Sequence, residues 1–584
     1  MRLTILLIGI TVPFSILSAQ KHDNSWVIGY PGNGAQYGHS LLTFDDGRLR
    51  IDTAAYTLPG YDFAFNNSVF SNPDGTLFAY FNGLQVHNRQ FTLMEGGEKM
   101  DEKIMQSYYL SSITTSQGSL YIPFPNKPDS VLLIYASEFL LIENGLVLDV
   151  CSGDINAAVI GRWSATDGLG KVLERKIGVI EKDTLVSGLV MACKHANGRD
   201  WWLLSFKRNS TKYHRILIDP AGFHPQEMGE ADLPIINGAG AACFSPDGTR
   251  FALYSSISES IGSYLNIFDF DRCAGIVNNQ TQIQSKREYG GLAFSSNSRY
   301  LYHNKRDTAF QYDLWAADIP ASRQVVSIYD GFKDPFPATF HMLQSAPDGK
   351  IYSSATNGTQ YLHVIHNPDE AGADCRYQQH GIQLLKYNSF CLPNFPNYRL
   401  GPLDGSPCDT LGLNNHPKAW YRYEQDTLDP LAVAFRDLSY YEPATWAWDF
   451  GDGSPASSTR HPQHQYAQPG AYPVCLTVSN QYGTDTHCKT LYLGVTAQDN
   501  PVLQAQVVVW PNPFRERFAV ALSVNLRSPA LRLYDAAGRL VVEQPLVFGV
   551  NEIEAEGVPA GLYVWEVTAG GERVKSGKCV KLAE

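Results

Sequence analysis

The most regular feature of the chain is a short pattern in which two apolar runs flank a polar turn. Residues 243–254 read Cys-Phe-Ser-Pro-Asp-Gly-Thr-Arg-Phe-Ala-Leu-Tyr, and residues 344–352 read Gln-Ser-Ala-Pro-Asp-Gly-Lys-Ile-Tyr. Pro presets φ at the second turn position, Asp bonds back to the backbone, and Gly takes the left-handed position. Each copy is therefore predicted to form a strand, a tight turn and a second strand.

The same turn returns at a nearly fixed spacing. Gly198, Gly248, Ser298 and Gly349 occupy equivalent positions about fifty residues apart. A period of ~40–50 residues with four strands per unit is typical of a β-propeller, whereas an array of β-sandwiches would repeat at ~100 residues. Further copies lie at residues 70–80 and, more faintly, at 45–47 and 128–131. These seven turns favour a propeller of seven blades over residues 20–405, with six or eight blades left open.

The composition fits an exported, β-rich chain and excludes one class of partner. Aromatic residues make up 12% of the 584 residues, beside 49 Gly and 33 Pro. The expected fold class is all-β, in three folded units, because ~150 residues per domain is usual and propellers run larger. The formal net charge of −12 argues against a nucleic-acid partner, since phosphate binding needs a basic surface.

The turn sequence and the end of the repeats add two expectations. The Ser-Pro-Asp-Gly form resembles the WD40-like repeats of exported bacterial propellers, without the Gly-His and Trp-Asp signature of the eukaryotic type. The repeat region ends in a Pro- and Gly-rich stretch at residues 392–405. We expect this stretch to be the exit from the propeller, followed by a flexible linker at 406–416.

A second domain is indicated by residues 446–453, which read Trp-Ala-Trp-Asp-Phe-Gly-Asp-Gly. Trp448 and Phe450 alternate into the core of a sandwich, and Gly-Asp-Gly makes the tight turn out of that strand. With the Pro-Gly turn and apolar strand at 469–478, the segment closely resembles a polycystic-kidney-disease (PKD) domain over residues 417–496. The resemblance implies an Ig-like β-sandwich that serves as a spacer.

The ten cysteines of an exported chain are disulfide candidates. Cys475 and Cys488 are the pair we expect, because they lie on two strands joined by a short connection. Cys375 with Cys391 is a second suggestion, and the remaining pairings are open. Metal binding is the competing interpretation, but the chain has no CxxC motif and no clustered His/Cys spacing.

Two acids of the PKD-like segment are metal candidates. Asp449 and Asp452 are three positions apart and could coordinate calcium. The alternative is that Asp452 caps a turn while Asp449 faces solvent, and in PKD-like domains these acids are mainly structural. No cofactor is therefore predicted, and a structural calcium ion is the competing hypothesis.

The tail, residues 506–584, reads as short strands separated by turns. Leu531 and Leu533 alternate with polar neighbours, and turn residues follow at 535–538 and 559–561. Several short strands in so short a segment predict a second small β-sandwich.

The motifs of this tail resemble the type A C-terminal sorting domain of the Bacteroidota type IX secretion system. The matching residues are Pro511, Asn512, Pro513, Gly538, Gly561, Tyr563, Gly577, Lys578 and Lys581. Cys579 is not part of that pattern. The resemblance implies the type IX machinery as a partner and a location on the outer-membrane surface or in the medium, reached through the periplasm. An ordinary terminal Ig-like domain without a sorting role is the competing interpretation.

The other end of the chain reads as an export signal. Arg2 supplies a positive charge, residues 3–17 are apolar apart from a few small or polar positions and one Pro, and residues 18–20 offer small-residue cleavage sites. The apolar run is shorter than the ~18–20 residues of a spanning helix. We expect a signal peptide at 1–19, no transmembrane segment in the mature chain, and a second linker at 497–505.

The sequence contains no recognisable catalytic motif, so no catalytic or cofactor-binding residue is predicted. HExxH, GxSxG and P-loop motifs are absent. The run Gly-Ala-Gly-Ala-Ala-Cys at 238–243 lacks the last Gly of a dinucleotide loop and leads into a strand. His341, His363 and His366 are close in sequence, but residues three apart on a strand face opposite sides. Core or surface histidines are therefore favoured over a metal site.

Two functional hypotheses remain. In the first, the propeller of a secreted, non-catalytic protein binds a protein, peptide or glycan partner. In the second, an extracellular propeller enzyme of the lyase or glycosidase kind has its site at the mouth of the central channel. Propellers assemble such sites from distant residues, so missing motifs do not exclude an enzyme. A channel mouth lined by aromatic and uncharged polar groups would favour binding, and three or more convergent ionisable groups would favour catalysis.

Overall fold

The computed structural model describes most of the chain, and the regular structure of that part is β apart from two short 3-10 helices. These are η1 (Pro320–Ser322) and η2 (Gly372–Cys375). The described residues are 21–30, 37–45, 47–53, 63, 65–101, 115–143, 146–162, 169–256, 262–286, 289–390, 392–426, 428–493, 507–510, 513–522, 529–535, 538–547, 549–569 and 572–582. The predicted signal peptide and the predicted linker at 497–505 lie outside them.

The chain falls into two compact units. Unit 1 consists of Met1–Arg422, Leu438–Ala444 and Val478–Asp485, and unit 2 of Tyr423–Asp437, Thr445–Thr477 and Thr486–Glu584. Two loops of the segment that resembles a PKD domain therefore group with unit 1.

Seven antiparallel sheets follow one another along the described part of unit 1, each built from consecutive strands. The first sheet is β1 (Ser25–Tyr30), β2 (Gly38–Asp45) and β3 (Arg48–Thr53), and the second is β4 (Ser68–Ser71), β5 (Leu77–Phe81) and β6 (Val86–Asn88). The third is β7 (Ser119–Pro123), β8 (Ser130–Glu143), β9 (Leu146–Gly161) and β10 (Lys171–Ile180). The fourth is β11 (Met191–Lys194), β12 (Trp201–Phe206), β13 (Ser210–Asp219) and β14 (Gly222–Pro225), with β15 (Gly229–Ile235) also paired to β13.

The last three sheets of unit 1 have four strands each. The fifth is β16 (Ala239–Phe244), β17 (Arg250–Ser256), β18 (Ser263–Asp271) and β19 (Ile276–Ser285). The sixth is β20 (Leu292–Phe294), β21 (Tyr300–Asn304), β22 (Thr308–Asp313) and β23 (Gln324–Ile328). The seventh is β24 (Phe340–Ser345), β25 (Ile351–Ala355), β26 (Thr359–Ile365) and β27 (Tyr377–Asn388).

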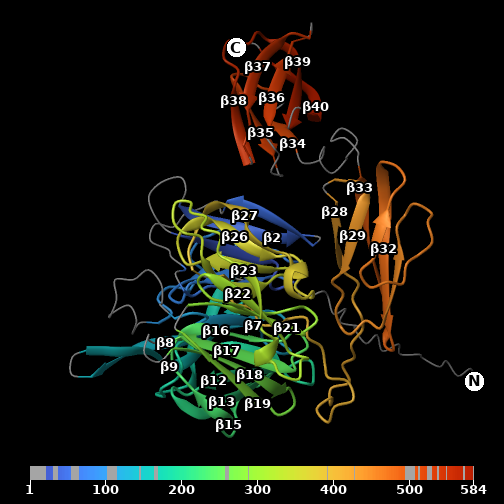
Figure 1. Cartoon of the computed structure of the whole chain (residues 1–584). Coiled ribbons are helices and arrows are strands. Elements are labelled where there is room, and N and C mark those ends of the chain that lie inside the picture. Colours follow the sequence, from blue (N-terminus) through green and yellow to red (C-terminus); the bar gives the residue numbers. More distant parts are fainter. Residues whose placement is uncertain are drawn as a thin grey trace, which may run out of the picture. The chain divides into compact units, whose positions relative to one another are not determined.

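The first strands of neighbouring sheets lie against one another. β1 contacts β4, β4 contacts β7, β11 contacts β16, β16 contacts β20, and β20 contacts β24. The third and fourth sheets are joined where the Val190 N–H donates to the Gln117 carbonyl oxygen at 2.9 Å. The seventh sheet returns to the first, since the Tyr352 ring lies 5.8 Å from the rings of Trp26 and Phe44. The sheets therefore follow one another around a ring, which is the arrangement of a β-propeller. Strands from most of these sheets are labelled in Figure 1.

Five of the recurring turns, those at Gly75, Gly198, Gly248, Ser298 and Gly349, join the first and second strands of their sheets, whereas the fainter copy at 45–47 joins β2 and β3. The predicted left-handed positions are confirmed: φ is +94° at Gly75, +76° at Gly198, +72° at Gly248, +60° at Ser298 and +74° at Gly349. The Asp247 carboxylate accepts the Thr249 N–H at 3.0 Å, and the Asn297 side chain accepts the Arg299 N–H at the same distance. The side chain before the left-handed residue therefore stabilises the turn, even where Ser replaces Gly.

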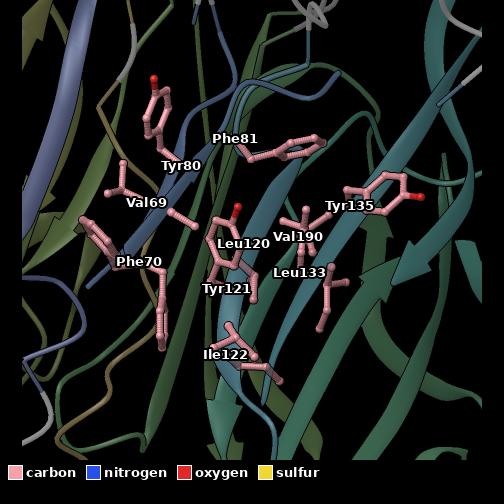
Figure 2. Packing of buried hydrophobic residues seen from close by; sticks show 14 of the residues in the cluster. Val69, Phe70, Tyr80, Phe81, Leu120, Tyr121, Ile122, Leu133, Tyr135 and Val190 are labelled. Carbon is pink, nitrogen blue, oxygen red and sulfur yellow. The ribbon is translucent and has the colours of Figure 1, made fainter. Parts of the chain in front are cut away.

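Large apolar side chains fill the space between neighbouring sheets. The rings of Phe70 and Tyr121, from the second and third sheets, have centroids 5.9 Å apart. Leu120, Ile122 and Leu133 of the third sheet are fully buried in the same cluster, as Figure 2 shows. Burial of this kind stabilises the fold by roughly 1.5–3 kcal/mol per large side chain.

Two three-stranded sheets form the PKD-like segment. The first is β28 (Tyr421–Gln425), β29 (Ala432–Asp437) and β31 (Gln463–Gln465), and the second is β30 (Thr445–Asp449), β32 (Gly470–Asn480) and β33 (Gly483–Leu493). Trp448 and Phe450 are buried, and their rings lie 5.4 and 5.5 Å from that of Phe435. The predicted alternation into a sandwich core is confirmed, and φ is +75° at Gly451 and +79° at Gly453 in the turn that follows.

The tail also forms two sheets. One is β34 (Val507–Trp510), β35 (Arg517–Leu522) and β38 (Gly549–Glu554), and the other has the order β37 (Leu540–Pro545), β36 (Ala530–Tyr534), β39 (Gly561–Ala569) and β40 (Glu572–Lys581). Leu531, Leu533 and Val567 of the second sheet are buried with Val520 of the first. The alternation at Leu531 and Leu533 that predicted a half-buried strand is confirmed.

Candidate functional site

The chain leaves β27 and crosses the middle of unit 1 in an extended segment, residues 392–403, which we call the axial segment. Its contacts reach the second to fifth sheets: Asn394 N–H to Asn67 O at 2.8 Å, Tyr398 Oη to Tyr121 O at 2.8 Å, Leu403 N–H to Ala196 O at 2.8 Å, and Asn397 Nδ2 to Pro246 O at 2.6 Å. The Phe395 ring lies 6.1 Å from Trp26 of the first sheet. Contacts with five of the seven sheets place this segment near the axis of the ring, where the sequence predicted a channel.

Asn394 is the most heavily bonded residue of the axial segment. Its side chain is buried, and its Nδ2 donates to the carbonyl oxygens of Ser119 at 2.9 Å and Val190 at 3.1 Å. Its Oδ1 accepts from Gln117 Nε2 at 3.3 Å. Gln117 in turn exchanges two hydrogen bonds with the backbone of Ala242, at 2.7 and 3.1 Å. One amide pair therefore connects the axial segment to the third, fourth and fifth sheets.

The axial segment leaves the ring on the side where the recurring turns lie. Arg399 donates two hydrogen bonds of 2.6 Å to the Asp23 carboxylate, so this buried charge is paired. Arg272 donates to the carbonyl oxygens of Gly401 and, at 3.0 Å, of Lys194. Both arginines hold the segment in place, Arg399 through an ion pair and Arg272 through hydrogen bonds to backbone carbonyl groups.

The other end of the axial segment lies near Phe390. Its carbonyl oxygen accepts from Ser354 Oγ and lies 2.9 Å from His341 Nδ1. Its ring lies 4.6 Å from Phe65. Burial lowers the pKa of His341 to about 4, so this side chain is neutral at physiological pH. The side chains named here that contact Phe390 are therefore aromatic or uncharged polar groups.

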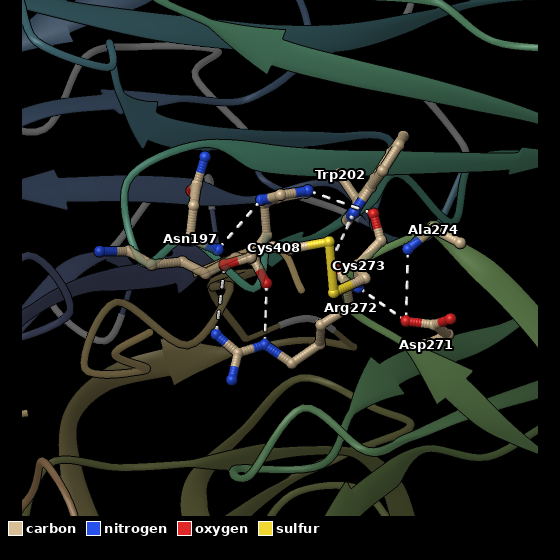
Figure 3. The surroundings of a disulfide bond; sticks show 9 residues. Asn197, Trp202, Asp271, Arg272, Cys273, Ala274 and Cys408 are labelled. Carbon is tan, nitrogen blue, oxygen red and sulfur yellow. Dashed lines mark hydrogen bonds between the residues drawn. A yellow bond between two sulfur atoms is a disulfide. The ribbon is translucent and has the colours of Figure 1, made fainter. Parts of the chain in front are cut away.

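A disulfide fastens the chain just beyond the axial segment. Cys408 is bonded to Cys273, 135 residues earlier, with a Cα–Cα distance of 5.6 Å (Figure 3). Cys273 lies in the turn between β18 and β19, where the Asp271 carboxylate accepts its N–H at 2.7 Å and that of Ala274 at 3.3 Å. This pairing was not identified from the sequence, because neither spacing nor local pattern relates the two positions.

The segment predicted as a flexible linker, 406–416, is anchored within unit 1. Beside the bridge at Cys408, Asn415 is buried, and its Nδ2 donates to Pro402 O at 3.0 Å and to Asp404 Oδ2 at 2.9 Å. Asn480 Nδ2 donates to the Asn415 carbonyl oxygen at 2.6 Å. A covalent bond and buried hydrogen bonds both restrict the movement of this segment.

Of the two cysteine pairs suggested by the sequence, one forms a disulfide and the other does not. Cys475 and Cys488 are joined by a disulfide with a Cα–Cα distance of 4.1 Å. Cys375 is a buried free thiol, so the suggested bridge to Cys391 is not formed, and Cys391 itself lies outside the described residues.

The three histidines close in sequence have three different partners. His341 bonds to the Phe390 carbonyl oxygen, His363 Nδ1 accepts the His380 N–H at 3.0 Å, and His366 Nε2 lies 2.8 Å from Gln378 Oε1. The described residues include no group of three or more His, Cys, Asp or Glu side chains placed to hold a metal ion.

The carboxylates of Asp449 and Asp452 in the PKD-like segment accept hydrogen bonds from residues of the same turn. Asp449 is exposed, and its carboxylate accepts the Gly451 N–H at 2.9 Å. Asp452 accepts from Ser454 N–H at 3.0 Å and Ser454 Oγ at 2.6 Å, and lies 2.8 Å from His464 Nε2. Burial raises the pKa of Asp452, but the hydrogen bonds from Ser454 and His464 outweigh it and lower this pKa to about 2. The arrangement is that of a turn cap.

The sorting-motif glycine in the last strand has a packing role. Gly577 on β40 lies opposite Trp565 on β39, and a Cβ at Gly577 would sit 2.5 Å from the indole ring. That distance is shorter than any ordinary carbon contact, and the obstacle is a nearly buried ring. Gly577 is therefore the residue that lets Trp565 lie flat over the neighbouring strand.

The first and last motifs of the tail meet in space. The Phe514 N–H donates to the Val580 carbonyl oxygen at 2.9 Å, and the Leu582 N–H donates to the Phe514 carbonyl oxygen at 2.8 Å. Lys581 Nζ donates to the Ala555 carbonyl oxygen at 2.5 Å. Pro513 precedes Phe514, so the chain's last strand is held against the start of the domain.

The other motif residues occupy separate positions. Gly538 has a φ of +79° in its hairpin turn, Tyr563 is buried with its Oη 2.6 Å from the Pro559 carbonyl oxygen, and Gly561 pairs with Lys581. Lys578 is exposed on β40, and Cys579 beside it is a buried free thiol opposite Tyr563. Pro511 and Asn512 lie outside the described residues.

In the part of the chain that the structure describes, no helix is long and apolar enough to cross a membrane.

Family models match two segments of the chain. Residues 423–495 match the model of the PKD domain, and residues 508–581 match that of the secretion system C-terminal sorting domain. The chain carries a PKD domain and a C-terminal sorting domain. The sorting domain implies contact with secretion machinery and passage across the outer membrane, to the cell surface or the medium.

Solved structures resemble both units. The PKD1 domain of the Vibrio cholerae metalloprotease PrtV is 28% identical, covering 14% of this chain and 99% of that domain, with a TM-score of 0.13. The PKD1 domain of Vibrio anguillarum Epp is 32% identical, covering 14% of this chain and 98% of that one, with a TM-score of 0.13. A putative 6-phosphogluconolactonase from Bacteroides fragilis is 14% identical, covering 64% of this chain and 99% of that one, with a TM-score of 0.37.

Proposed function

We propose that this is an exported, non-catalytic binding protein. A seven-bladed propeller over about residues 20–405 binds a protein, peptide or glycan outside the cell. The PKD domain acts as a spacer, and the tail directs export through the type IX machinery by its type A sorting motif. The signal peptide at 1–19 takes the chain into the periplasm first.

The observation that carries the binding function is the position of the axial segment near the centre of the ring. It occupies part of the place where a propeller enzyme would gather its catalytic groups, and the Asn394 side chain is hydrogen-bonded to Ser119, Val190 and Gln117, which lie in or next to the third and fourth sheets. The side chains named above that contact Phe390 are aromatic or uncharged, and Arg399 at the opposite end is neutralised by Asp23. These features support binding at the outer surface of the propeller over catalysis in a channel.

The export part of the proposal is tested by removing the tail. Deleting residues 506–584 should trap a folded protein in the periplasm, and fusing these residues to an unrelated exported protein should bring that cargo to the surface. Cell fractionation with surface proteolysis measures both. Full secretion of the truncated chain would show that the tail is only a further sandwich.

The binding part is tested on the secreted protein. Glycan arrays and pull-downs from culture medium should give a partner that is retained when residues 506–584 are absent, because the propeller carries the specificity. Turnover of a lyase or glycosidase substrate by the purified protein would overturn the non-catalytic assignment. A partner that is lost together with the PKD domain would move the binding site out of the propeller.

A further inference from the structure

The four-stranded sheet of the tail, labelled β36, β37, β39 and β40 in Figure 1, has an outer face that is apolar over one half. Along β39 the side chains of Tyr563, Trp565 and Val567 are buried in the core of the sandwich. Leu562 and Val564 alternate with them and therefore lie on the outer face, where they are 48% and 38% exposed. Exposed apolar side chains that stand alone are common, so these two are informative only if their neighbours are apolar as well.

The pairing of the strands gives both residues apolar neighbours. Val564 pairs with Tyr534 of β36, which pairs in turn with Leu540 of β37, itself 48% exposed. Leu562 pairs with Val580 of β40. Directly paired residues lie side by side on one face of a sheet. We call this surface the apolar half, and its five residues, all exposed or partly exposed, are Tyr534, Leu540, Leu562, Val564 and Val580.

The rest of the same outer face is polar. Arg532 pairs with Glu543 on one side and with Glu566 on the other, and its Nε donates to the Glu543 carboxylate at 2.7 Å. The other sheet of the tail also has charged residues on its outer face, where Arg517 Nη1 and Glu552 Oε2 are 3.5 Å apart. The apolar half is therefore a distinct surface and not a general property of the domain.

Several residues by which the tail resembles a sorting domain lie beside the apolar half. Lys578 is exposed and pairs with Val564, and Gly561 directly precedes Leu562. Gly538, in its hairpin turn, lies two positions before Leu540. Of the motif residues that the structure describes, none lies in the polar half of this face. The motif therefore surrounds the apolar half.

We propose that the apolar half is the surface by which a protein receptor of the type IX machinery recognises the tail. This inference deepens the proposed function and rests on it, because it takes the tail for the export signal. The sorting domain implies contact with secretion machinery, and burial of apolar surface is the main favourable contribution to most protein–protein association. The receptor surface that fits is itself apolar, since the five side chains offer one hydroxyl group and no charge. A second copy of the chain is a poorer occupant, because a formal net charge of −12 keeps copies apart.

The test compares double substitutions on one outer face, made in the full-length chain and expressed in a bacterium that has a type IX system. L562T/V564T replaces two apolar side chains by polar, β-branched ones that suit a strand. We expect at least a fivefold loss of protein from the cell surface and medium, with a matching rise in the periplasm, as measured by cell fractionation. R532T/E566T, the matched control in the polar half, should be exported as wild type is. L562I/V564I keeps the surface apolar and should also be exported as wild type is.

Folding is checked separately from export. Near-ultraviolet circular dichroism of the purified chains and the protease resistance of the tail should match wild type in all three variants. If L562T/V564T does not fold, L540T takes its place, because Leu540 is the first residue of β37 and its side chain is half exposed. This single substitution should lower export at least twofold.

Full export of a folded L562T/V564T chain, or equal losses in it and in R532T/E566T, would overturn the proposal. So would a wild-type dimer, detected by light scattering, that L562T/V564T dissociates while export continues, because the surface would then join two copies. Failure of the proposed function is distinguishable, since deletion of residues 506–584 would then leave export unchanged. If the deletion traps the protein and L562T/V564T does not, the tail is the signal and only this surface is wrong.

Discussion

In the described residues, the propeller region and the PKD domain each contain one disulfide, but the two bridges join the chain over very different distances. Cys475 and Cys488 are 13 residues apart on the adjacent strands β32 and β33, whereas Cys273 and Cys408 are 135 residues apart. The short bridge reinforces a pairing that the strands already make. The long bridge fixes a segment that belongs to none of the sheets. The PKD domain is held together by hydrogen bonds between its own neighbouring strands. The ring of sheets also depends on the axial segment, which belongs to none of the sheets.

The largest expected effect on the stability of the propeller comes from removing the axial segment. A chain that ends at residue 388 keeps all seven sheets but loses the axial segment, and with it Asn394, Tyr398 and Arg399. Large buried surfaces and several backbone groups would face an empty centre, so we expect no cooperative unfolding transition by calorimetry. A chain that ends at residue 422 keeps these contacts and Cys408 and is the matched control. Equal melting of the two would show that the sheets close without the axial segment.

The next effect compares the two bridges directly. Loop-closure entropy predicts a loss of about 4–5 kcal/mol for C273S/C408S and about 3 kcal/mol for C475S/C488S. The first pair should lower the melting temperature of the propeller alone, and the second that of the PKD domain alone. Calorimetry resolves the two transitions. A larger loss for the short bridge would mean that the axial segment holds its place without Cys408.

A smaller effect is expected from single side chains of the axial segment. N394A removes hydrogen bonds to Ser119, Val190 and Gln117, and should destabilise the propeller by about 2–4 kcal/mol because buried partners are left unsatisfied. N397A removes two half-buried hydrogen bonds, to the Pro246 carbonyl oxygen and from the Arg399 N–H, and should cost about 1–2 kcal/mol. Urea unfolding followed by Trp fluorescence measures both. Similar losses of stability in N394A and N397A would show that the axial segment is no more tightly held at Asn394 than at Asn397.

The last prediction concerns how the stability of the propeller depends on pH. Burial lowers the pKa of His22 to about 3, and those of His341 and His363 to about 4. Free histidine side chains titrate near pH ~6.5. Between these values the unfolded chain binds more protons than the folded one, so the stability of the propeller falls as the pH drops below about 6.5.

The PKD domain provides the contrast for this measurement. Asp452 has a pKa lowered to about 2, so its contribution to stability persists until much lower pH. Melting between pH 7 and pH 5 should therefore lower the propeller transition by several degrees and leave that of the PKD domain nearly unchanged. Parallel shifts of both transitions would mean that the buried histidines do not control the difference.

The features of this fold that could be predicted from the sequence are those determined by residues close together in the chain. The recurring turns depend on residues next to each other, so Gly248 and its equivalents could be assigned a left-handed conformation. Trp448 and Phe450 alternate along one strand, and their burial followed from that period. The tail motifs also follow a short-range pattern, although the contact between Phe514 and Val580 was not expected.

The parts that were missed have causes distant in the sequence. Residues 392–405 were interpreted as an exit because they are rich in Pro and Gly, yet Asn394, Asn397 and Tyr398 are large polar and aromatic residues unusual in a plain linker. That contrast was the available signal for the axial segment. Nothing near Cys408 points to Cys273, because their proximity is created by the closed ring.

The bond between Cys273 and Cys408 also determines how the molecule responds to mechanical load. A pull applied to the chain beyond residue 408 passes through the sulfur–sulfur bond into the hairpin of β18 and β19. Residues 392–407 then carry no tension, and the hydrogen bonds of Asn394 and Arg399 are not sheared. After reduction the same pull would act along the axial segment itself and draw it out of the ring. The bridge therefore keeps mechanical load off residues 392–407 as long as it is oxidised.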